Sequence, residues 1–312
     1  MPAPDLEERF IQPKNWQTGE FNSLGKRVHY GFALPQDREP HGIVLCLPGL
    51  SEFTEKYYEV ARECLSHNLA FYVIDWPGQG RSERYLSNPQ KRHGKDFTID
   101  VERVEDFVSQ IIKPEKPLAV LGHSMGANIG LRVLSQSPDL FKCAAFSAPM
   151  CGILSVNKIP FGSQILSVLN RFFHESYVSG GGDWHASMRD EGKTVFSHDP
   201  ARNALHGAWV AADPALAVGS PTFGWLYYAH QSCQKLIGKH TLGTIKTPCI
   251  IATGSKETIV DNRDTCTLVS KLENAELLEL EGAAHEILME VDELRGQFME
   301  QFFTLIDAHF TS

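Results

Sequence analysis

The sequence predicts an α/β fold: a mostly parallel central sheet with helices on both faces, interrupted by a helical insertion. Two observations indicate this fold. Short, continuously apolar runs typical of buried parallel strands alternate with amphipathic segments towards both ends of the chain. From about Met150 to Leu242 that alternation is lost, and Gly, Pro, His and aromatic residues become frequent. We therefore expect a first core segment over 1–149, a cap-like insertion over 150–242 and a second core segment over 243–312.

The first core segment opens with a polar lead-in over residues 1 to about 24, for which we expect no strand. After it, apolar alternation and continuous apolar runs predict strands, and amphipathic periodicity predicts the helices between them. The expected strands are Arg27–Leu34, Gly42–Leu47, Leu69–Asp75, Pro117–Leu121 and Cys143–Ala148. The expected helices are Lys56–Ser66, Asp96–Ile112 and Ala127–Gln136.

The strand and helix alternation resumes near Thr247. The expected elements are the strands Pro248–Thr253 and Ala275–Leu280 and the helices Asp261–Leu272 and Val291–His309. Strand–helix repeats joined by short loops predict a parallel sheet covered on both faces.

Composition excludes several classes of protein. The 312 residues carry a formal net charge of -9, which argues against a nucleic-acid-binding surface. The seven cysteines are odd in number and contain no Cys-x-x-Cys pair, so we expect buried reduced thiols and neither zinc nor disulfides. No cofactor or metal is implied. The polar stretch from Met1 to Asn22 predicts no signal peptide, and we expect a soluble cytoplasmic protein without a membrane span.

A Gly-x-Ser-x-Gly motif lies at Gly122–Gly126, between the predicted strand Pro117–Leu121 and the predicted helix from Ala127. Strand, sharp turn and helix form the context that a nucleophile elbow requires. We expect the two glycines because a Cβ there would collide with the neighbouring strand or helix. Ser124 is therefore the candidate nucleophile, and the N-terminus of the following helix would help to stabilise negative charge.

A serine nucleophile needs a base, and the base needs a carboxylate to orient it. His285 follows the last predicted strand, where such groups gather, and is the candidate base. His123 occupies the variable position of the motif, and we expect its ring to point away from the pocket. Two carboxylates compete for the acid, Glu257 and Asp261, and the alternative role of Asp261 is a helix N-cap.

An oxyanion hole needs two backbone N–H groups. Met125, directly after the candidate nucleophile, is one candidate donor. The second should come from the loop after the strand Gly42–Leu47, and Leu50 is the candidate there.

These residues together resemble the α/β-hydrolase superfamily, in which serine, acid and histidine follow in this order. The closer resemblance is to the lysophospholipase and monoacylglycerol lipase group, the serine aminopeptidase-like hydrolases. It is carried by Pro48–Phe53 with Glu55–Tyr57, by Asp75–Ser82 and by Gly122–Ala127. Asp213–Pro214, Gly219–Trp225 and His285–Glu290 resemble the bacterial lysophospholipase branch, and the resemblance runs from about Phe10 to the C-terminus.

The resemblance implies the α/β-hydrolase fold with a cap over the pocket, matching Met150–Leu242. It implies Ser124 as nucleophile, His285 as base, and Leu50 and Met125 as oxyanion donors. The family carries an Asp where this chain has Glu257. Because some α/β-hydrolases use Ser-His-Glu, we favour Glu257 over Asp261 as the acid.

The first functional hypothesis is a carboxylic ester hydrolase that works through an acyl-enzyme. The apolar insertion would suit a single acyl chain, as in a lysophospholipid or a monoacylglycerol. The candidate substrate-binding residues are Phe53, His123, Trp184, Phe223 and Trp225. An amphipathic cap could also contact a membrane surface transiently, although no basic face supports this. The sequence carries no indication of an oligomeric state.

Two alternatives stay open. The same triad could serve a peptidase or a small-molecule esterase. A relative that binds ligands but is weakly active is the alternative from another class, since the change to Glu257 could weaken catalysis. Whether a carboxylate reaches the His285 ring discriminates this last hypothesis from the first.

Overall fold

The computed structural model describes residues 4–189, 195–238, 241 and 243–310. Within these residues, eight strands form one sheet in the order β1-β2-β4-β3-β5-β6-β7-β8. The strands from β3 to β8 run parallel, whereas β2 is antiparallel to both β1 and β4. Their bounds are β1 (Trp16–Ser23), β2 (Lys26–Ala33), β3 (Gly42–Leu47), β4 (Leu69–Ile74), β5 (Leu118–His123), β6 (Cys143–Ser147), β7 (Cys249–Gly254) and β8 (Ala275–Leu280).

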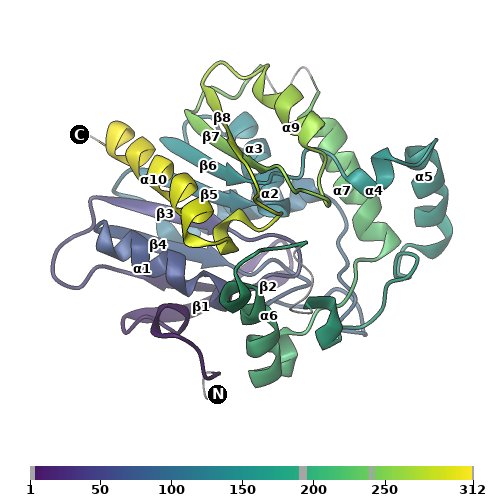
Figure 1. Ribbon diagram of the computed structural model, residues 1–312, viewed down its shortest axis with the longest axis horizontal. Helices are drawn as coiled ribbons and strands as arrows, with labels where there is room; N and C mark the ends of the chain where they lie inside the picture. The colour runs from purple at the N-terminus through teal and green to yellow at the C-terminus, as the bar shows by residue number, and fades with distance from the viewer. Residues whose placement is uncertain (1–3, 190–194, 239–240, 242, 311–312) are drawn as a thin grey trace.

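Helices cover both faces of this sheet. Figure 1 shows α1 and α10 in front of the strands and α2 and α3 behind them. The helices of the two core segments are α1 (Tyr58–Ser66), α2 (Phe97–Phe107), α3 (Met125–Gln136), α9 (Asn262–Val269) and α10 (Asp292–His309). The predicted parallel sheet with two covered faces is therefore confirmed.

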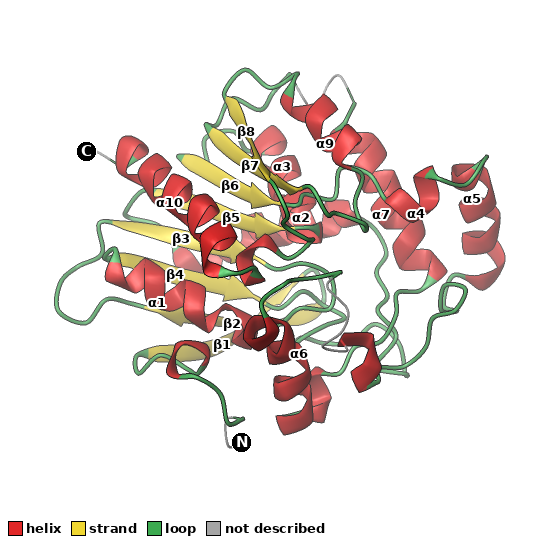
Figure 2. Cartoon of the chain, in the orientation of Figure 1, coloured by secondary structure: helices red, strands yellow, loops and turns green. Residues whose placement is uncertain are grey.

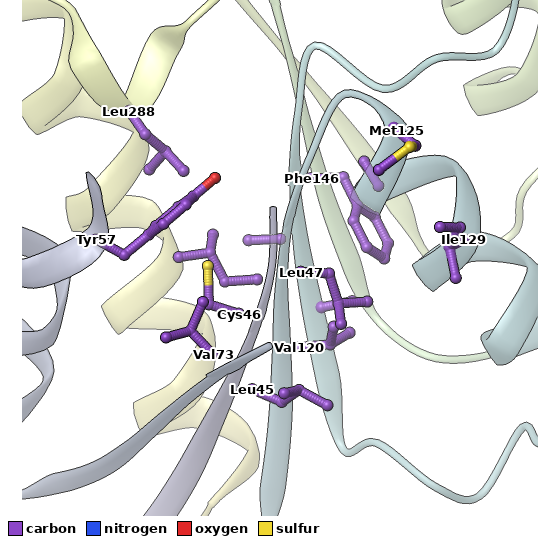
Figure 3. Packing of buried hydrophobic residues seen from close by; sticks show 14 of the residues in the cluster. Leu45, Cys46, Leu47, Tyr57, Val73, Val120, Met125, Ile129, Phe146 and Leu288 are labelled. Carbon is purple, nitrogen blue, oxygen red and sulfur yellow. The ribbon is translucent and has the colours of Figure 1, made fainter. Parts of the chain in front are cut away.

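The central strands are buried on both sides, which explains their unbroken apolar sequences. Every residue of β3, β5 and β6 is buried. Figure 3 shows Tyr57 and Leu288 packed on one side of these strands, with Met125 and Ile129 on the other. This packing holds the carboxyl ends of β3 and β5 in place, next to the candidate site.

One expectation about the fold was wrong: the polar lead-in contains β1. This strand pairs with β2 at the edge of the sheet. It buries Trp16, Phe21 and Ser23 and exposes most of its other residues. An edge strand that is solvated on one face needs few apolar residues, so its sequence resembles that of a polar loop. The predicted ends of the other core strands differ from the observed ones by a few residues at most.

The insertion between β6 and β7 is helical, as expected. It contains α4 (Leu154–Asn157), α5 (Gly162–Phe173), the 3₁₀ turn Ala186–Arg189, α6 (Pro200–Ala212) and α7 (Phe223–Leu236). Figure 2 shows these helices beyond the carboxyl ends of the central strands, and α7 packs against α3. The boundaries 150 and 242 stay a prediction, and Leu242 lies outside the described residues. None of the helices in the described ranges has the length and apolarity needed to cross a membrane.

A buried arginine ties the insertion to the core. The guanidinium of Arg202, on α6, donates two hydrogen bonds of 2.8 Å to the carboxylate of Glu59 on α1. It donates another of 2.5 Å to Asp292 at the start of α10 and one of 2.7 Å to the carbonyl of Glu290. One side chain thus joins α6 to two helices that lie on the sheet.

Replacing Arg202 with Ala should lower the free energy of unfolding by about 3 kcal/mol, because the buried carboxylate of Glu59 loses its principal partner. Urea unfolding followed by circular dichroism measures this. The control is Lys246→Ala, which removes an exposed ion pair with Glu273 and should leave the unfolding midpoint unchanged. Equal effects of the two substitutions would contradict the importance of this contact.

Candidate active site

Ser124 lies in the sharp turn between β5 and α3. Its backbone has φ 50° and ψ −111°, a combination that L-residues rarely adopt and that costs about 1–3 kcal/mol. Hydrogen bonds hold it there: its N–H donates to the carbonyl of Ser147 (3.0 Å), and its carbonyl accepts from the N–H of Met150 (3.0 Å). The strand, sharp turn and helix expected around this motif are present.

The two glycines of the motif are there for the predicted steric reason. A Cβ on Gly126 would lie 2.0 Å from the carbonyl oxygen of Leu47, at the end of β3. A Cβ on Gly122 would lie 2.9 Å from Cα of Ala127 and 3.0 Å from the ring of Phe146. A side chain at either position would push α3 away from the sheet.

The structure brings Ser124, His285 and Glu257 together. Nε2 of His285 lies 3.0 Å from Oγ of Ser124, and Nδ1 lies 2.6 Å from Oε2 of Glu257. With the Nδ1 proton donated to the carboxylate, Nε2 is left to accept the serine proton. The other carboxylate oxygen of Glu257 accepts from the N–H groups of Ile259 (2.6 Å) and Val260 (3.2 Å), which fixes its direction.

The electrostatics keep Glu257 ionised. Burial by itself disfavours its charged form. The attraction of His285, the hydrogen bond to that ring and the two backbone hydrogen bonds outweigh burial and lower the pKa of Glu257. A carboxylate that stays charged can orient the imidazole and stabilise its protonated form.

The alternative acid, Asp261, is engaged elsewhere. It caps the N-terminus of α9, and its carboxylate accepts from Asn157 (3.0 Å) and from the guanidinium of Arg263 (2.8 Å). The hydrogen bond from Arg263 is the main reason why the pKa of Asp261 falls to about 2. Of the two described carboxylates that the sequence left open, Glu257 is the one that hydrogen-bonds His285.

In the loop after β3, the backbone N–H groups on either side of Leu50 are hydrogen-bonded. The N–H of Gly49 donates to Glu52 (2.5 Å), and the N–H of Ser51 donates to the amide oxygen of Gln79 (3.0 Å). The amide nitrogen of Gln79 donates in turn to the carbonyls of Gly49 and Glu52, at 2.8 Å each. Leu50 lies between the two engaged N–H groups and lines the cavity at Ser124.

Met125 offers the second candidate donor. It is the first residue of α3, where a backbone N–H has no acceptor within the helix. In the ranges that the structure describes, neither Leu50 nor Met125 donates its N–H to a protein acceptor. Both candidate oxyanion donors are therefore free to bind a ligand oxygen.

A cavity of about 340 Å³ opens at Ser124, a size typical of small-molecule sites. Most of its wall is apolar. Its described lining is Leu50, Glu52, His123, Ser124, Met150, Ile153, Ser155, Arg189, Phe196, Pro221, Trp225, Leu226, Thr258, Ile259, Val260, His285 and Glu286.

Of the five predicted substrate contacts, His123 and Trp225 line this cavity. The expectation that the ring of His123 points away from the pocket was wrong: it lies 4.9 Å from the His285 ring, centroid to centroid. The other three, Phe53, Trp184 and Phe223, are not among the described lining residues.

These three residues have packing roles instead. Phe53 and Trp184 both pack against the ring of His206 on α6, with centroid distances of 5.0 and 4.8 Å. Phe223 begins α7 and packs against the hydrophobic core. Phe53 thus joins the first core segment to α6 of the insertion, whereas Trp184 packs against α6 within the insertion.

A buried cluster of alternating charges next to the cavity was missed by sequence reasoning. Nζ of Lys56 lies 2.7 Å from Glu52 and 2.9 Å from Glu286. Nη2 of Arg189, from the insertion, lies 2.7 Å from the other oxygen of Glu286. Burial disfavours a charged Glu286, but Arg189 and Lys56 outweigh it and lower its pKa well below the ordinary value. Charged residues are usually exposed, so nothing in the local sequence indicated this buried cluster.

Two carboxylates of this cluster, together with His123, could be mistaken for a metal site. Glu52, His123 and Glu286 present ligand atoms within 4.8 Å of one another. However, the ammonium group of Lys56 hydrogen-bonds both carboxylates, and a metal ion would have to displace it. The residues present therefore do not fit a cation.

Comparison with known proteins shows a family and several relatives that this chain resembles. The family described as serine aminopeptidase, S33, matches residues 38–292. Lysophospholipase L2 of Escherichia coli (strain K12) is 29% identical over 278 residues, covering 86% of this chain and 80% of that protein. Probable lysophospholipase L2 of Haemophilus influenzae is 25% identical over 294 residues, covering 92% and 90%.

A solved structure shares the fold. A soluble variant of monoglyceride lipase from Saccharomyces cerevisiae, in complex with a substrate analogue, superposes with a TM-score of 0.75 at 20% identity. The match covers 100% of this chain and 97% of that one. This likeness confirms the predicted fold class.

Glu257→Gln should slow the covalent labelling of Ser124 by a fluorophosphonate probe at least about 10³-fold, because a neutral amide neither fixes the tautomer nor stabilises the protonated ring. Asp261→Asn, the matched control, should be labelled at nearly the wild-type rate. The opposite order of the two rates would make Asp261 the acid.

Asp261 should instead affect stability in a pH-dependent way. Its pKa in the fold, about 2, lies below that of the unfolded chain, so its charge stabilises the fold above about pH 4. That contribution is lost as the pH falls towards 2. The difference in melting temperature between wild type and Asp261→Asn should therefore shrink over this window, and a constant difference would contradict the assignment.

Proposed function

Because the chain belongs to the serine aminopeptidase S33 family, we propose that it is a serine hydrolase that cleaves carboxylic esters of single-chain lipids. The observation that carries the proposal is the hydrogen-bonded series Ser124–His285–Glu257 at an apolar cavity. The names of its relatives, lysophospholipase and monoglyceride lipase, support a lysophospholipid or a monoacylglycerol as substrate.

In the proposed mechanism, Oγ of Ser124 attacks the ester carbonyl while Nε2 of His285 takes its proton. Glu257 holds the ring and stabilises the imidazolium that forms. The N–H groups of Leu50 and Met125, the latter at the N-terminus of α3, donate to the oxyanion. His285 then protonates the leaving alcohol, and a water molecule activated by the same ring hydrolyses the acyl-enzyme.

The insertion acts as a cap in this proposal. Its segment after residue 194 contacts the loop of the base directly: the N–H of His285 donates to the carbonyl of Val195 (3.4 Å), and the N–H of Glu286 donates to that of Phe196 (2.7 Å). Through Phe196, Ile153, Trp225 and Leu226, the insertion supplies apolar wall for one acyl chain.

The alternatives are less well supported. An aminopeptidase would need a free carboxylate in the cavity to bind the substrate's ammonium group. Among the described lining residues, the two glutamates, Glu52 and Glu286, are already paired with Lys56 and Arg189. A weakly active ligand-binding relative is disfavoured because Glu257 reaches the His285 ring at 2.6 Å.

We also propose a transient contact of the insertion with lipid surfaces. Around α5, large apolar side chains are exposed to solvent, with Phe161 77% and Phe172 67% exposed. The others in this patch are Ile159, Ile165, Val168 and Phe173. A contiguous apolar patch of this kind suits a surface that presents lipid substrates.

A cytoplasmic location is a further part of the proposal. All seven cysteines are free, and six of them are buried. Free thiols throughout a chain favour a reducing compartment.

The serine mechanism predicts that Ser124→Ala loses both fluorophosphonate labelling and turnover of a short p-nitrophenyl ester, by about 10³-fold or more. The wild type and Ser270→Ala, an exposed serine at the end of α9, should show both. Absence of labelling in the wild type would refute the serine hydrolase proposal.

The double variant Phe161→Ser, Phe172→Ser should hydrolyse lipid presented in vesicles more slowly than the wild type does, and a water-soluble ester at the same rate. The control is Leu34→Ser, which also removes an exposed apolar side chain, at the end of β2. Vesicle flotation measures the binding itself. Unchanged flotation of the double variant would refute the membrane contact.

A further inference from the structure

Arg189 reaches the cavity from the insertion and is held from two directions. It ends the 3₁₀ turn Ala186–Arg189, lines the same cavity as Ser124, and its side chain is only 8% exposed. Nη2 lies 2.7 Å from Glu286, the neighbour of the base His285, and Cζ lies 3.8 Å from the centroid of the Phe196 ring. The guanidinium is therefore fixed beside the site.

The other terminal nitrogen of Arg189 is buried without a partner. Nη1 has no hydrogen-bond acceptor among the described residues. A buried guanidinium N–H that gives up water without gaining an acceptor is costly, and such groups call for an explanation. Because Arg189 lines the cavity, a ligand oxygen that reaches Nη1 from there would satisfy it.

The carboxylates near Arg189 are already paired with cations and would not repel an anion bound there. Both oxygens of Glu286 are engaged, one by Lys56 and one by Arg189. Glu52 is engaged by Lys56 and by the hydroxyl of Tyr57 (2.6 Å). No unpaired carboxylate among the described lining residues would repel an anion, and Arg189 is the one Lys or Arg among them.

We propose that Arg189 binds the phosphate of a lysophospholipid head group while the ester lies at Ser124. The inference rests on the proposed ester hydrolase function and makes its substrate more specific: phosphate-bearing single-chain lipids rather than neutral monoacylglycerols. A guanidinium with one nitrogen on Glu286 and a second one free matches a phosphate oxygen, with which it forms a strong charge-assisted hydrogen bond. The phosphate belongs to the leaving alcohol, so this contact would not hinder the acyl chain on the apolar wall.

Arg189→Gln tests the subsite by a ratio of rates. We would measure kcat/KM for hexanoyl lysophosphatidylcholine and for hexanoyl glycerol, which carry the same acyl chain and are both dispersed as monomers. The ratio should fall about tenfold or more, mainly through KM for the lysophospholipid, because one charge-assisted contact is lost. Gln retains an amide that can donate to Glu286, which also keeps Lys56. Arg189→Lys should recover part of the ratio.

The matched control is Arg171→Gln, an exposed arginine of α5, which should leave the ratio unchanged. An equal loss on both substrates would overturn the proposal, because it would mean that Arg189 only supports the fold of the site. It would also be the result if Arg189 held the fatty-acid carboxylate, since both substrates release the same acid. An unchanged ratio would overturn the proposal as well.

Binding separates this inference from the proposed function. In the Ser124→Ala background, calorimetry with the same lysophospholipid should show binding that Arg189→Gln weakens about tenfold. If the wild type hydrolyses neither ester, the proposed function fails and this binding measurement still decides the role of Arg189. If Arg189→Gln binds as tightly as Ser124→Ala alone, the phosphate subsite is refuted.

Discussion

The site depends on the close approach of α3 to the end of β3. The carbonyl of Leu47 lies so near to Gly126 that a Cβ there would come within 2.0 Å of its oxygen. This approach brings the N–H of Met125 beside the loop that carries Leu50, and it forces Ser124 into a strained backbone conformation with φ 50°. The strain, about 1–3 kcal/mol, is tolerated because the strands on either side are completely buried and leave the turn no alternative.

A second interaction, between charges, joins the two halves of the site. Lys56 hydrogen-bonds Glu52, in the loop that carries Leu50, and Glu286, next to His285. Buried ion pairs add little net stability, because the cost of removing the charges from water offsets their attraction. Their effect here is positional: loops more than 200 residues apart in the sequence are held at one distance. The turn after β5 fixes Ser124, and this bridge fixes the loop of His285 relative to the loop of Leu50.

The candidate site residues could be predicted from the sequence where the pattern that indicates them lies in neighbouring residues. Ser124, Glu257 and His285 follow predicted strands within a few residues, and the complete burial of β5 and β7 makes those two strands apolar and easy to recognise. The charge cluster could not be predicted, because Lys56 belongs to a helix whose charges would ordinarily face water, and its partner Glu286 is distant in sequence. The packing of Phe53 and Trp184 against His206 was hidden for the same reason: composition indicates an aromatic site, and only the tertiary structure decides which ring faces the ligand.

The insertion is hydrogen-bonded to the loop that carries His285, so residues of the insertion can influence which substrates the site accepts. Val195 and Phe196 accept hydrogen bonds from the backbone of His285 and Glu286, and Arg202 anchors α6 to two core helices. The insertion is thus part of the structure that positions His285. Arg189 belongs to this insertion, and its bond to Glu286 leaves one buried nitrogen with no acceptor in the described part of the chain. A substrate phosphate would then complete a hydrogen-bond network that already extends to the residue beside the base, so head-group recognition and positioning of the catalytic groups would share one side chain.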